Sequence, residues 1–182
     1  MMITTLAYIV VGFGILRLVI ATLNLLLQER LPQPKSRESL PSLSVLIPAR
    51  NEAHNIEALL SDLTHVESEC LLEIIVCDDA SEDSTAELVE TWMQRDSRIR
   101  LISSSGPPSG WLGKNHACHL LSRQARGRYL LFLDADVRLS PAFIERVLSY
   151  ATTHRLSLLS LFPRLSPLRP EDKIIFPVLR KY

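Results

Sequence analysis

Short apolar runs alternate with amphipathic segments after residue 42, and this alternation limits the fold more than any other feature. The apolar runs are four to seven residues long, and the segments between them carry apolar residues at helical spacing. Near-continuous apolar strands separated by helices are typical of a parallel sheet covered on both faces, an α/β fold. The predicted strands are 43–47, 73–77, 99–102, 129–133 and 156–162, and the predicted helices are 53–63, 85–94, 115–125 and 141–150.

A long apolar run precedes this domain. Residues 6–27 are almost wholly apolar, and Arg17 is the one charged residue in 1–28. Twenty-two residues span about 33 Å as a helix, which matches a hydrocarbon core of about 30 Å. A signal peptide would have a basic start, a shorter apolar run and a small-residue cleavage site, and a buried core helix would be shorter. We therefore predict one transmembrane anchor over residues 1–28.

Flanking charges predict the orientation of this anchor. Arg30, Lys35 and Arg37 follow the span, and no Lys or Arg lies in the first sixteen residues. The positive-inside rule then places a single-pass protein in the cell membrane with its C-terminal domain in the cytoplasm. Residues 29–42, which hold three prolines among serines and charges, are predicted to be a linker.

The composition of the whole chain excludes several classes of protein. The 20 basic and 20 acidic residues cancel, so no basic field is available for nucleic acid. Three cysteines, without C-x-x-C spacing, predict free thiols in a reducing compartment rather than a disulfide scaffold. The domain predicted over residues 43–165 is large enough to bury a hydrophobic core without disulfides or a structural metal.

Polar clusters follow the predicted strands. They are the sequences PARNE at 48–52, DDASED at 78–83 and DAD at 134–136, and the loop GWLGKN at 110–115 precedes the third helix of the domain. In parallel α/β sheets, ligands bind beyond the carboxyl ends of the strands. These clusters are therefore expected to share one functional edge.

Asp134 and Asp136 are the sharpest feature of that edge. Two carboxylates one residue apart form a hard oxygen site that suits Mg²⁺ or Mn²⁺ shared with substrate phosphates. Such an ion would neutralise a leaving diphosphate. The alternative is that these acids only cap a helix or lie in a solvated loop, because Ser140 and Pro141 begin a helix soon after.

Other residues at this edge also allow two interpretations. Asp78 and Asp79 could recognise a nucleotide base or ribose as acceptors, or they could cap the next helix together with Ser81, Asp83 and Ser84. Asn51 could cap a helix. Lys114 could reach a base or diphosphate, or it could be a surface lysine.

His116 and His119 allow a zinc site as one interpretation. Their three-residue spacing puts both on one helix face, with Cys118 between them. No second ligand pair has suitable spacing, so helix-surface histidines are the preferred interpretation.

Four sequence segments, in this order, carry a resemblance to a known family: PARNE, IIVCDDASEDST, GWLGKNHAC and YLLFLDADVRLSP. Together they resemble the N-terminal, donor-binding part of a family 2 inverting glycosyltransferase with the GT-A fold. The resemblance covers residues 43–162. The apolar N-terminus and the GWLGKN loop are most similar to a membrane-associated branch that glycosylates lipids or carotenoids, including hydroxychlorobactene glucosyltransferase-like proteins.

The resemblance implies a role for each matching position. Pro48, Ala49 and Glu52 would line the nucleotide pocket, and Asp79, with Asp78 beside it, would contact the base. Asp134 and Asp136 would form the D-x-D motif, with Asp136 the direct metal ligand. Lys114 would help to hold the nucleotide. The implied donor is a nucleoside-diphosphate sugar, with a UDP-sugar favoured, and the implied acceptor is a lipid-like hydroxyl at the membrane.

The chain departs from the family pattern after the D-x-D motif. Inverting enzymes need a carboxylate base to deprotonate the acceptor, and only Glu145, Glu171 and Asp172 follow Asp136. None of them matches the family's base motif, and the later Q-x-x-R-W-type motif is missing. Residues 166–182 are therefore expected to be an interfacial segment or the end of a truncated product, and the catalytic residue stays unassigned.

Three other functions compete with this one. A nucleotide-sugar-binding module without turnover would need the same donor site and no base. A sugar nucleotidylyltransferase would need a glycine-rich stretch after the first strand, and PARNE has no glycine. A dinucleotide oxidoreductase would need G-x-G-x-x-G after a strand, which is also absent.

Overall fold

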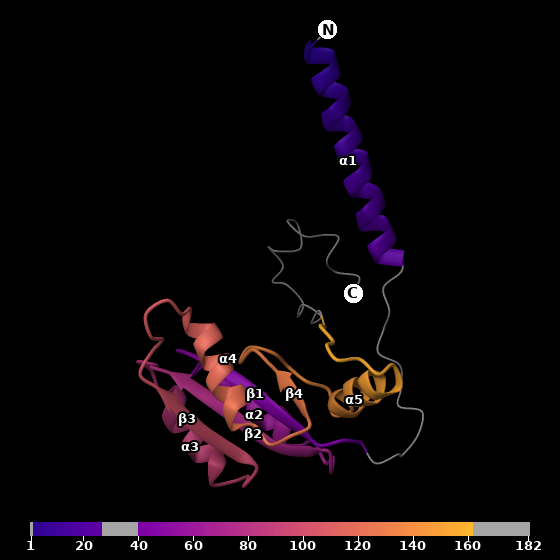
Figure 1. Cartoon of the computed structure of the whole chain (residues 1–182). Coiled ribbons are helices and arrows are strands. Elements are labelled where there is room, and N and C mark those ends of the chain that lie inside the picture. Colours follow the sequence, from indigo (N-terminus) through magenta and orange to yellow (C-terminus); the bar gives the residue numbers. More distant parts are fainter. Residues whose placement is uncertain (1, 27–39, 162–182) are drawn as a thin grey trace. The chain divides into compact units, whose positions relative to one another are not determined.

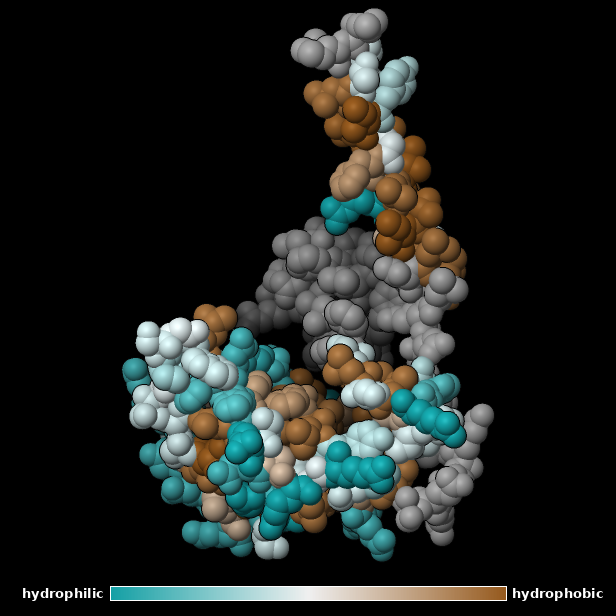
Figure 2. Space-filling view, in the orientation of Figure 1, coloured by the Kyte–Doolittle hydropathy of each residue, from teal (hydrophilic) through white to brown (hydrophobic). Residues whose placement is uncertain are grey.

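The computed structural model describes residues 2–26 and 40–161, which fall into two compact units. The first unit contains the helix α1 (Met2–Leu26). Residues 4–23 of α1 are apolar and long enough to cross a membrane by length and composition, a test that a signal sequence near an N-terminus also passes. None of the most apolar window is buried, unlike the core helix of a soluble domain, and Figure 2 shows the apolar side chains along α1.

The second unit is an α/β domain built on one parallel sheet (Figure 1). Its strands lie in the order β3-β2-β1-β4. The elements follow along the chain as β1 (Leu43–Ala49), α2 (Ile56–Thr64), β2 (Leu71–Asp79), α3 (Thr85–Met93), β3 (Ile99–Ser104), α4 (Gly113–Gln124), β4 (Tyr129–Phe132) and α5 (Phe143–Thr153). The parallel α/β architecture predicted from the alternation is confirmed.

Two cores lie on opposite faces of the sheet because successive strand residues point to opposite sides. Val45 and Ile47 of β1 face the larger core, with apolar residues of α2, α3 and α5. Leu46 of β1 faces the smaller core, with Ala117 and Leu121 of α4. The predicted covering of both faces is therefore confirmed.

The strand order changes direction at β1. From β1 the chain moves outward to β2 and β3, and it then returns past β1 to form β4 on the other side. Right-handed crossovers in opposite directions place α2 and α3 on one face and α4 on the other. The carboxyl ends of β1 and β4 therefore form the point at which open α/β sheets bind ligands.

The fifth predicted strand is not found in the described residues. Residues 156–161 have no regular structure, and residue 162 lies outside the described part. The turn after α5 explains the break: Arg155 has a positive φ of 52°, and the Leu156 amide donates to the Ala151 carbonyl at 2.8 Å. Within the described chain, the outer edge of β4 therefore has no strand paired to it.

The smaller-core face of β4 is only partly covered in the described chain. Leu130 and Phe132 point to this face, and they are 41% and 44% exposed. Their alternating neighbours Tyr129 and Leu131 pack against the larger core. Strand β4 is thus an edge strand with one buried face and one open face.

A buried carboxylate joins the strands near their amino-terminal ends. Glu73 is fully buried and accepts hydrogen bonds from Ser44 Oγ at 2.7 Å, from the Arg126 amide at 2.6 Å and from Arg100 at 2.9 Å. Burial alone would raise the pKa of Glu73, but these hydrogen bonds outweigh it and hold the pKa below its usual value. The site connects β1, β2 and β3 to the turn before β4.

The domain boundaries predicted at 29–42 and 166–182 lie largely or wholly outside the described residues. The three cysteines are free, and Cys70 and Cys77 are buried. Burial, reinforced by Asp79 and Asp78, raises the pKa of Cys77 to about 12. That thiol is therefore neutral at physiological pH and a poor nucleophile.

Candidate functional site

The polar clusters predicted to share one edge do lie at the carboxyl ends of parallel strands. Ala49 at the end of β1 is paired with Asp78 of β2. Leu46 is paired with Phe132 at the end of β4, two residues before Asp134. The edge therefore brings together residues that lie up to about 90 positions apart in the sequence.

Asp79 has a buried oxygen with no hydrogen-bond partner among the described residues. It is the last residue of β2 and is 4% exposed, and the orphan atom is Oδ1. Its other oxygen, Oδ2, would lie 2.7 Å from a Cβ added at Gly113, the first residue of α4. Glycine at 113 thus allows the helix to begin against the carboxylate. An unsatisfied buried acceptor is unfavourable, so this atom is a candidate to receive a donor from a ligand.

Asp78 has a local partner instead. Its Oδ1 accepts a hydrogen bond from the Ser81 amide at 3.3 Å, which closes the turn after β2. Within that turn Ala80 has a φ of +56°, a left-handed conformation that is strained for alanine. The two adjacent carboxylates therefore differ: Asp78 supports the turn, whereas Asp79 Oδ1 has no partner in the part of the chain that the structure describes.

The loops after β1 and β2 are joined to each other by hydrogen bonds. The Asn51 amide donates to Ser81 Oγ at 2.9 Å, and Asn51 Oδ1 accepts from the Glu82 amide at 2.8 Å. Two further bonds run from the amides of Glu52 and Ala53 to Thr85 Oγ1 and Asp83 Oδ2. These hydrogen bonds fix the position of the loop after β1 relative to the loop after β2.

These bonds correct two capping predictions. Asn51 does not cap a helix, because α2 begins at Ile56, and the intervening residues form a turn. Ser84 occupies the cap position of α3 but makes no cap bond with its side chain, whereas Asp83 accepts from the Thr85 amide at 3.0 Å. Asp83 is thus the side chain that caps α3.

The three β1-end residues assigned to the nucleotide pocket differ in their exposure. Ala49 is buried in the larger core, so only its backbone faces the edge, and Pro48 is half-buried. The carboxylate of Glu52 accepts a hydrogen bond from Asn55 Nδ2 at 2.8 Å. Of the three, Glu52 is the one with a polar side chain near the edge.

Asp134 and Asp136 are both exposed after β4, and Lys114 reaches the first of them. Lys114 Nζ lies 2.6 Å from Asp134 Oδ1. The hydrogen bond to Asp134 raises the pKa of Lys114, and Asp136 contributes to the same effect. The start of α4 therefore lies against two carboxylates of the edge, Asp79 through Gly113 and Asp134 through Lys114.

The donor chemistry of this pair fits a divalent ion shared with a substrate. No group of three or more His, Cys, Asp or Glu in the described residues could enclose a metal by itself. Mg²⁺ is commonly held by one or two carboxylates together with substrate phosphates. The Asp134–Asp136 pair suits that arrangement and not an all-protein cage.

One contact near the D-x-D motif was not foreseen from sequence. Asp62 of α2 binds Arg138, two residues after Asp136, through two hydrogen bonds of 2.7 Å, and it also accepts from the Leu139 amide at 3.0 Å. The hydrogen bond with Arg138 lowers the pKa of Asp62. The acid and its partner lie 76 residues apart, so no local sequence signal could have revealed the contact.

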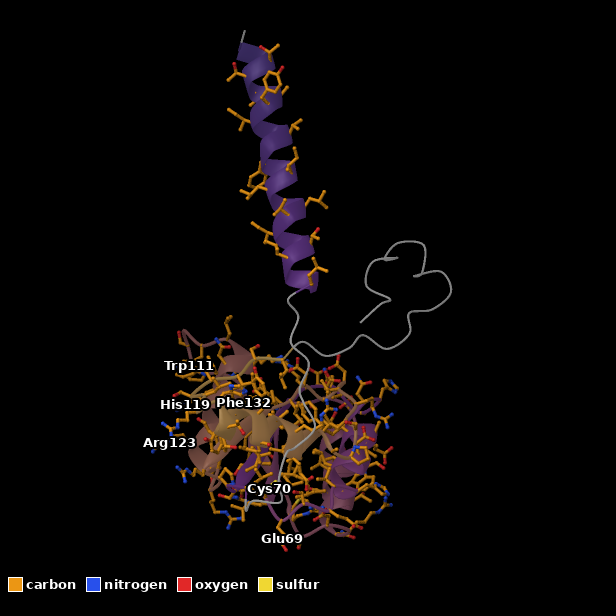
Figure 3. All side chains as sticks on the ribbon, turned by 90° about the vertical axis from the view of Figure 1, so that its right-hand side faces the viewer. Glu69, Cys70, Trp111, His119, Arg123 and Phe132 are labelled. Carbon is orange, nitrogen blue, oxygen red and sulfur yellow. The ribbon has the colours of Figure 1, made fainter. Side chains whose placement is uncertain are left out.

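Trp111 forms an aromatic cluster at the start of α4. Its ring lies 5.8 Å from the ring of His116 and 5.3 Å from that of His119, and Figure 3 shows Trp111 and His119 on the same side of the domain. Trp111 stays 45% exposed. The two histidines therefore lie on one helix face, as their spacing predicted, and both contact the tryptophan.

The acids that follow Asp136 provide no base at this edge within the described chain. Glu145 Oε1 accepts a hydrogen bond from Ser68 Oγ at 3.1 Å, and Ser68 precedes β2, at the opposite end of the sheet. Glu171 and Asp172 lie outside the described residues.

Comparison with known protein families identifies the domain. Residues 44–166 match the sequence model described as Glycosyl transferase family 2. A 4,4'-diaponeurosporenoate glycosyltransferase from Staphylococcus haemolyticus is 34% identical over 128 residues, which cover 69% of this chain and 33% of that protein. The probable glycosyltransferase YdaM from Bacillus subtilis is 34% identical over 107 residues, 57% of this chain and 25% of that protein. The chain thus spans a third or less of the length of these relatives.

Solved structures share the fold. The mannosyltransferase PcManGT from Pyrobaculum calidifontis, in complex with GDP-Man and Mn²⁺, aligns with a TM-score of 0.62 and 24% identity over 80% of this chain and 42% of that chain. S. aureus TarS 1-349 in complex with UDP aligns with a TM-score of 0.54 and 25% identity over 63% of this chain and 33% of that chain. The predicted GT-A fold is confirmed.

Proposed function

This chain belongs to glycosyl transferase family 2, and from that membership we propose that it binds a nucleoside-diphosphate sugar at the carboxyl edge of its sheet and transfers the sugar to an acceptor hydroxyl. The observation that carries the proposal is the buried, unpartnered Asp79 Oδ1 beside the Lys114–Asp134 pair. A nucleotide would present a base to the first group and a diphosphate to the second.

The carboxylate of Asp79 suggests which bases fit. An ionised carboxylate only accepts hydrogen bonds, so it suits a base with an N–H on its pairing edge, such as uracil or guanine. Related structures contain UDP and GDP-Man. We favour a UDP-sugar as the donor.

Asp134 and Asp136 would hold a Mg²⁺ or Mn²⁺ ion, whose charge would neutralise the diphosphate leaving group. Lys114, in the first turn of α4, would add a positive charge on the same side of the diphosphate. Pro48, Glu52 and the backbone of Ala49 would border the nucleotide, and Asp78 would keep the turn behind Asp79 in place.

Titration of the full chain in detergent with UDP, with and without Mn²⁺, tests the donor site. Asp136→Asn should weaken Mn²⁺-dependent binding of UDP about tenfold or more, because an ion–carboxylate contact is lost. Glu82→Gln, which neutralises an acid at the same edge outside the proposed metal pair, is the matched control. Equal UDP–Mn²⁺ affinity in the wild type and in Asp136→Asn would contradict the metal site.

A second function, a donor-binding module without turnover, is supported by the placement of Glu145 away from the edge. Incubation with labelled UDP-sugar separates the two. Labelled lipid product or donor hydrolysis would indicate an enzyme, whereas binding of UDP without either product would indicate a module.

Helix α1 and the relatives support proposals about the acceptor and the location. An apolar acceptor is supported by the name of the diaponeurosporenoate-glycosylating relative, and a membrane anchor by the length and composition of α1. We propose a single-pass protein of the cell membrane with its domain on the cytoplasmic side. Deletion of residues 1–28 should move the chain from the membrane pellet to the soluble fraction, and continued sedimentation would contradict α1 as the sole anchor.

A further inference from the structure

The ion pair between Lys114 and Asp134 occupies one of the two carboxylates proposed to bind metal. Lys114 Nζ lies 2.6 Å from Asp134 Oδ1, and the two side chains are 64% and 58% exposed. Exposed ion pairs are weak because water screens them. The contact is therefore strong enough to orient the lysine but weak enough to be replaced by a better ligand.

No other ion pair of the described residues involves this site. The others join Arg98 to Asp96, Arg100 and Arg126 to Glu73, and Arg138 to Asp62. Lys114 is thus the one paired cation in contact with the D-x-D carboxylates in the described part of the chain. Asp136 also interacts electrostatically with Lys114, so both carboxylates attract the ammonium group.

The position of Lys114 in α4 is unfavourable without an anion nearby. It is the second residue of the helix, where the exposed amides carry partial positive charge. A lysine in a first turn is repelled by that charge and is stabilised by a carboxylate or a phosphate. In the structure the carboxylate of Asp134 meets this need.

A divalent ion on Asp134 would change this balance. The ion and the ammonium group would be like charges within a few ångströms of each other, and they would compete for one carboxylate. Lysine has a flexible four-carbon stem, so its ammonium can leave Asp134 without movement of the helix. The donor diphosphate would then be the nearest new anion.

We propose that Lys114 is a built-in counter-ion of Asp134, which occupies the carboxylate while no metal is bound and turns to the donor diphosphate when metal displaces it. This inference rests on the function proposed above. If so, metal and nucleotide bind cooperatively. Metal on Asp134 frees the ammonium group of Lys114, and the nucleotide diphosphate then binds that ammonium group.

The test uses the full chain in detergent and the variant Lys114→Met, which keeps the stem and removes the charge. Binding of Mn²⁺ alone is measured by electron paramagnetic resonance, and binding of UDP with and without Mn²⁺ by calorimetry. We expect the variant to bind Mn²⁺ alone roughly two- to fivefold more tightly, because a competing ion pair is gone. We expect it to bind UDP in the presence of Mn²⁺ roughly tenfold more weakly, because a charged hydrogen bond is lost.

The deciding quantity is the factor by which Mn²⁺ strengthens UDP binding. It should be smaller in Lys114→Met than in the wild type. Arg123→Met is the matched control, since it removes the same charge from the last turn of the same helix (Figure 3), and it should change neither affinity.

Two results would overturn the inference. Unchanged or weaker Mn²⁺ binding in Lys114→Met would mean that the lysine does not compete with metal, and an unchanged coupling factor would mean that it does not turn to the nucleotide. In both cases the wild type would still bind UDP and Mn²⁺, so the proposed function would stand. A wild type that binds neither ligand would overturn both proposals.

Discussion

The guanidinium of Arg138 donates two hydrogen bonds of 2.7 Å to the carboxylate of Asp62, and this contact joins the segment after β4 to helix α2. Asp62 also accepts from the Leu139 amide, so three bonds fix the chain just beyond Asp136. Bidentate pairs of this type set orientation as well as energy. The contact therefore fixes the direction in which the D-x-D segment leaves the sheet.

Replacement of Asp62 by Asn should weaken Mn²⁺-dependent UDP binding about tenfold, at the low end of effects for groups that orient metal ligands. The reason is that Asn cannot form the charged bidentate pair, so the segment after Asp136 loses its fixed direction. Calorimetry on the full chain measures the affinity, and circular dichroism checks that the domain is folded.

Asp96→Asn is the control for that variant, because Asp96 also forms a close pair with an arginine, Arg98, but before β3. It should cost a similar stability and leave UDP affinity unchanged. If Asp62→Asn and Asp96→Asn reduce UDP binding equally, the effect is general destabilisation and not positioning.

Gly113→Ala should weaken UDP binding about tenfold, because the added methyl would lie 2.7 Å from Asp79 Oδ2 and would displace that carboxylate. Gly14→Ala is the control: it is also a helical glycine, and its methyl would meet nothing within 4 Å. Calorimetric titration with UDP distinguishes the two variants. Wild-type UDP affinity in Gly113→Ala would mean that Asp79 does not need its observed position to bind nucleotide.

The sequence allowed the architecture and the site edge to be predicted for one physical reason. Buried parallel strands are mostly apolar, so polar residues such as Asp79 and Asp134 gather where a strand ends. Glu73 and Ser44 inside β2 and β1 are exceptions, and they are hydrogen-bonded to each other. The edge of the sheet is thus visible in the one-dimensional pattern. The GWLGKN loop was placed correctly next to this edge, although α4 begins at Gly113 and not at Asn115.

What the pattern could not reveal depends on contacts between distant segments. The pairing of Asp62 with Arg138 leaves no trace in local spacing, because both residues look like ordinary surface charges. The predicted strand at 156–162 is wrong over residues 156–161 for a related reason: an apolar run favours a strand, but its spacing does not show whether the segment reaches the free edge of β4, and residues 156–161 pair with no described strand. The alternative that Asn51 caps a helix is wrong, because its partners, Ser81 and Glu82, lie on another loop.

Ala80→Gly should stabilise the domain by about 0.5–1 kcal/mol. A left-handed alanine is strained by about 1–2 kcal/mol, and glycine removes that strain but loses part of the gain through the entropy of its unfolded state. Urea unfolding of both forms in the same detergent measures the difference. Ala53→Gly, at a turn residue without positive φ, should instead be neutral or destabilising. A lower midpoint for Ala80→Gly would mean that the turn is not strained.

Glu73→Gln should lower the free energy of unfolding at pH 7 by about 1.5–3 kcal/mol, the range for hydrogen bonds to a charged group. Glutamine can still accept from Ser44 or from the Arg126 amide, but it cannot balance the charges of Arg100 and Arg126. Urea unfolding followed by far-ultraviolet circular dichroism provides the measurement. Glu87→Gln, on the first turn of α3, removes a carboxylate that has no such network among residues 2–26 and 40–161, and it should have little effect.

The pH dependence of the stability difference between the wild type and Glu73→Gln shows whether Glu73 acts through its charge or through packing. Because the folded-state pKa of Glu73 is below its usual value of 4.5, its ionised form stabilises the native state above that pH, and this contribution is lost as the pH falls through the folded-state pKa. The difference in stability between wild type and Glu73→Gln should therefore be full at pH 7 and should shrink steadily below pH 4.5. A difference that stays constant from pH 7 into the acid range would mean that Glu73 acts through packing and neutral hydrogen bonds, and that its negative charge does not hold the two arginines.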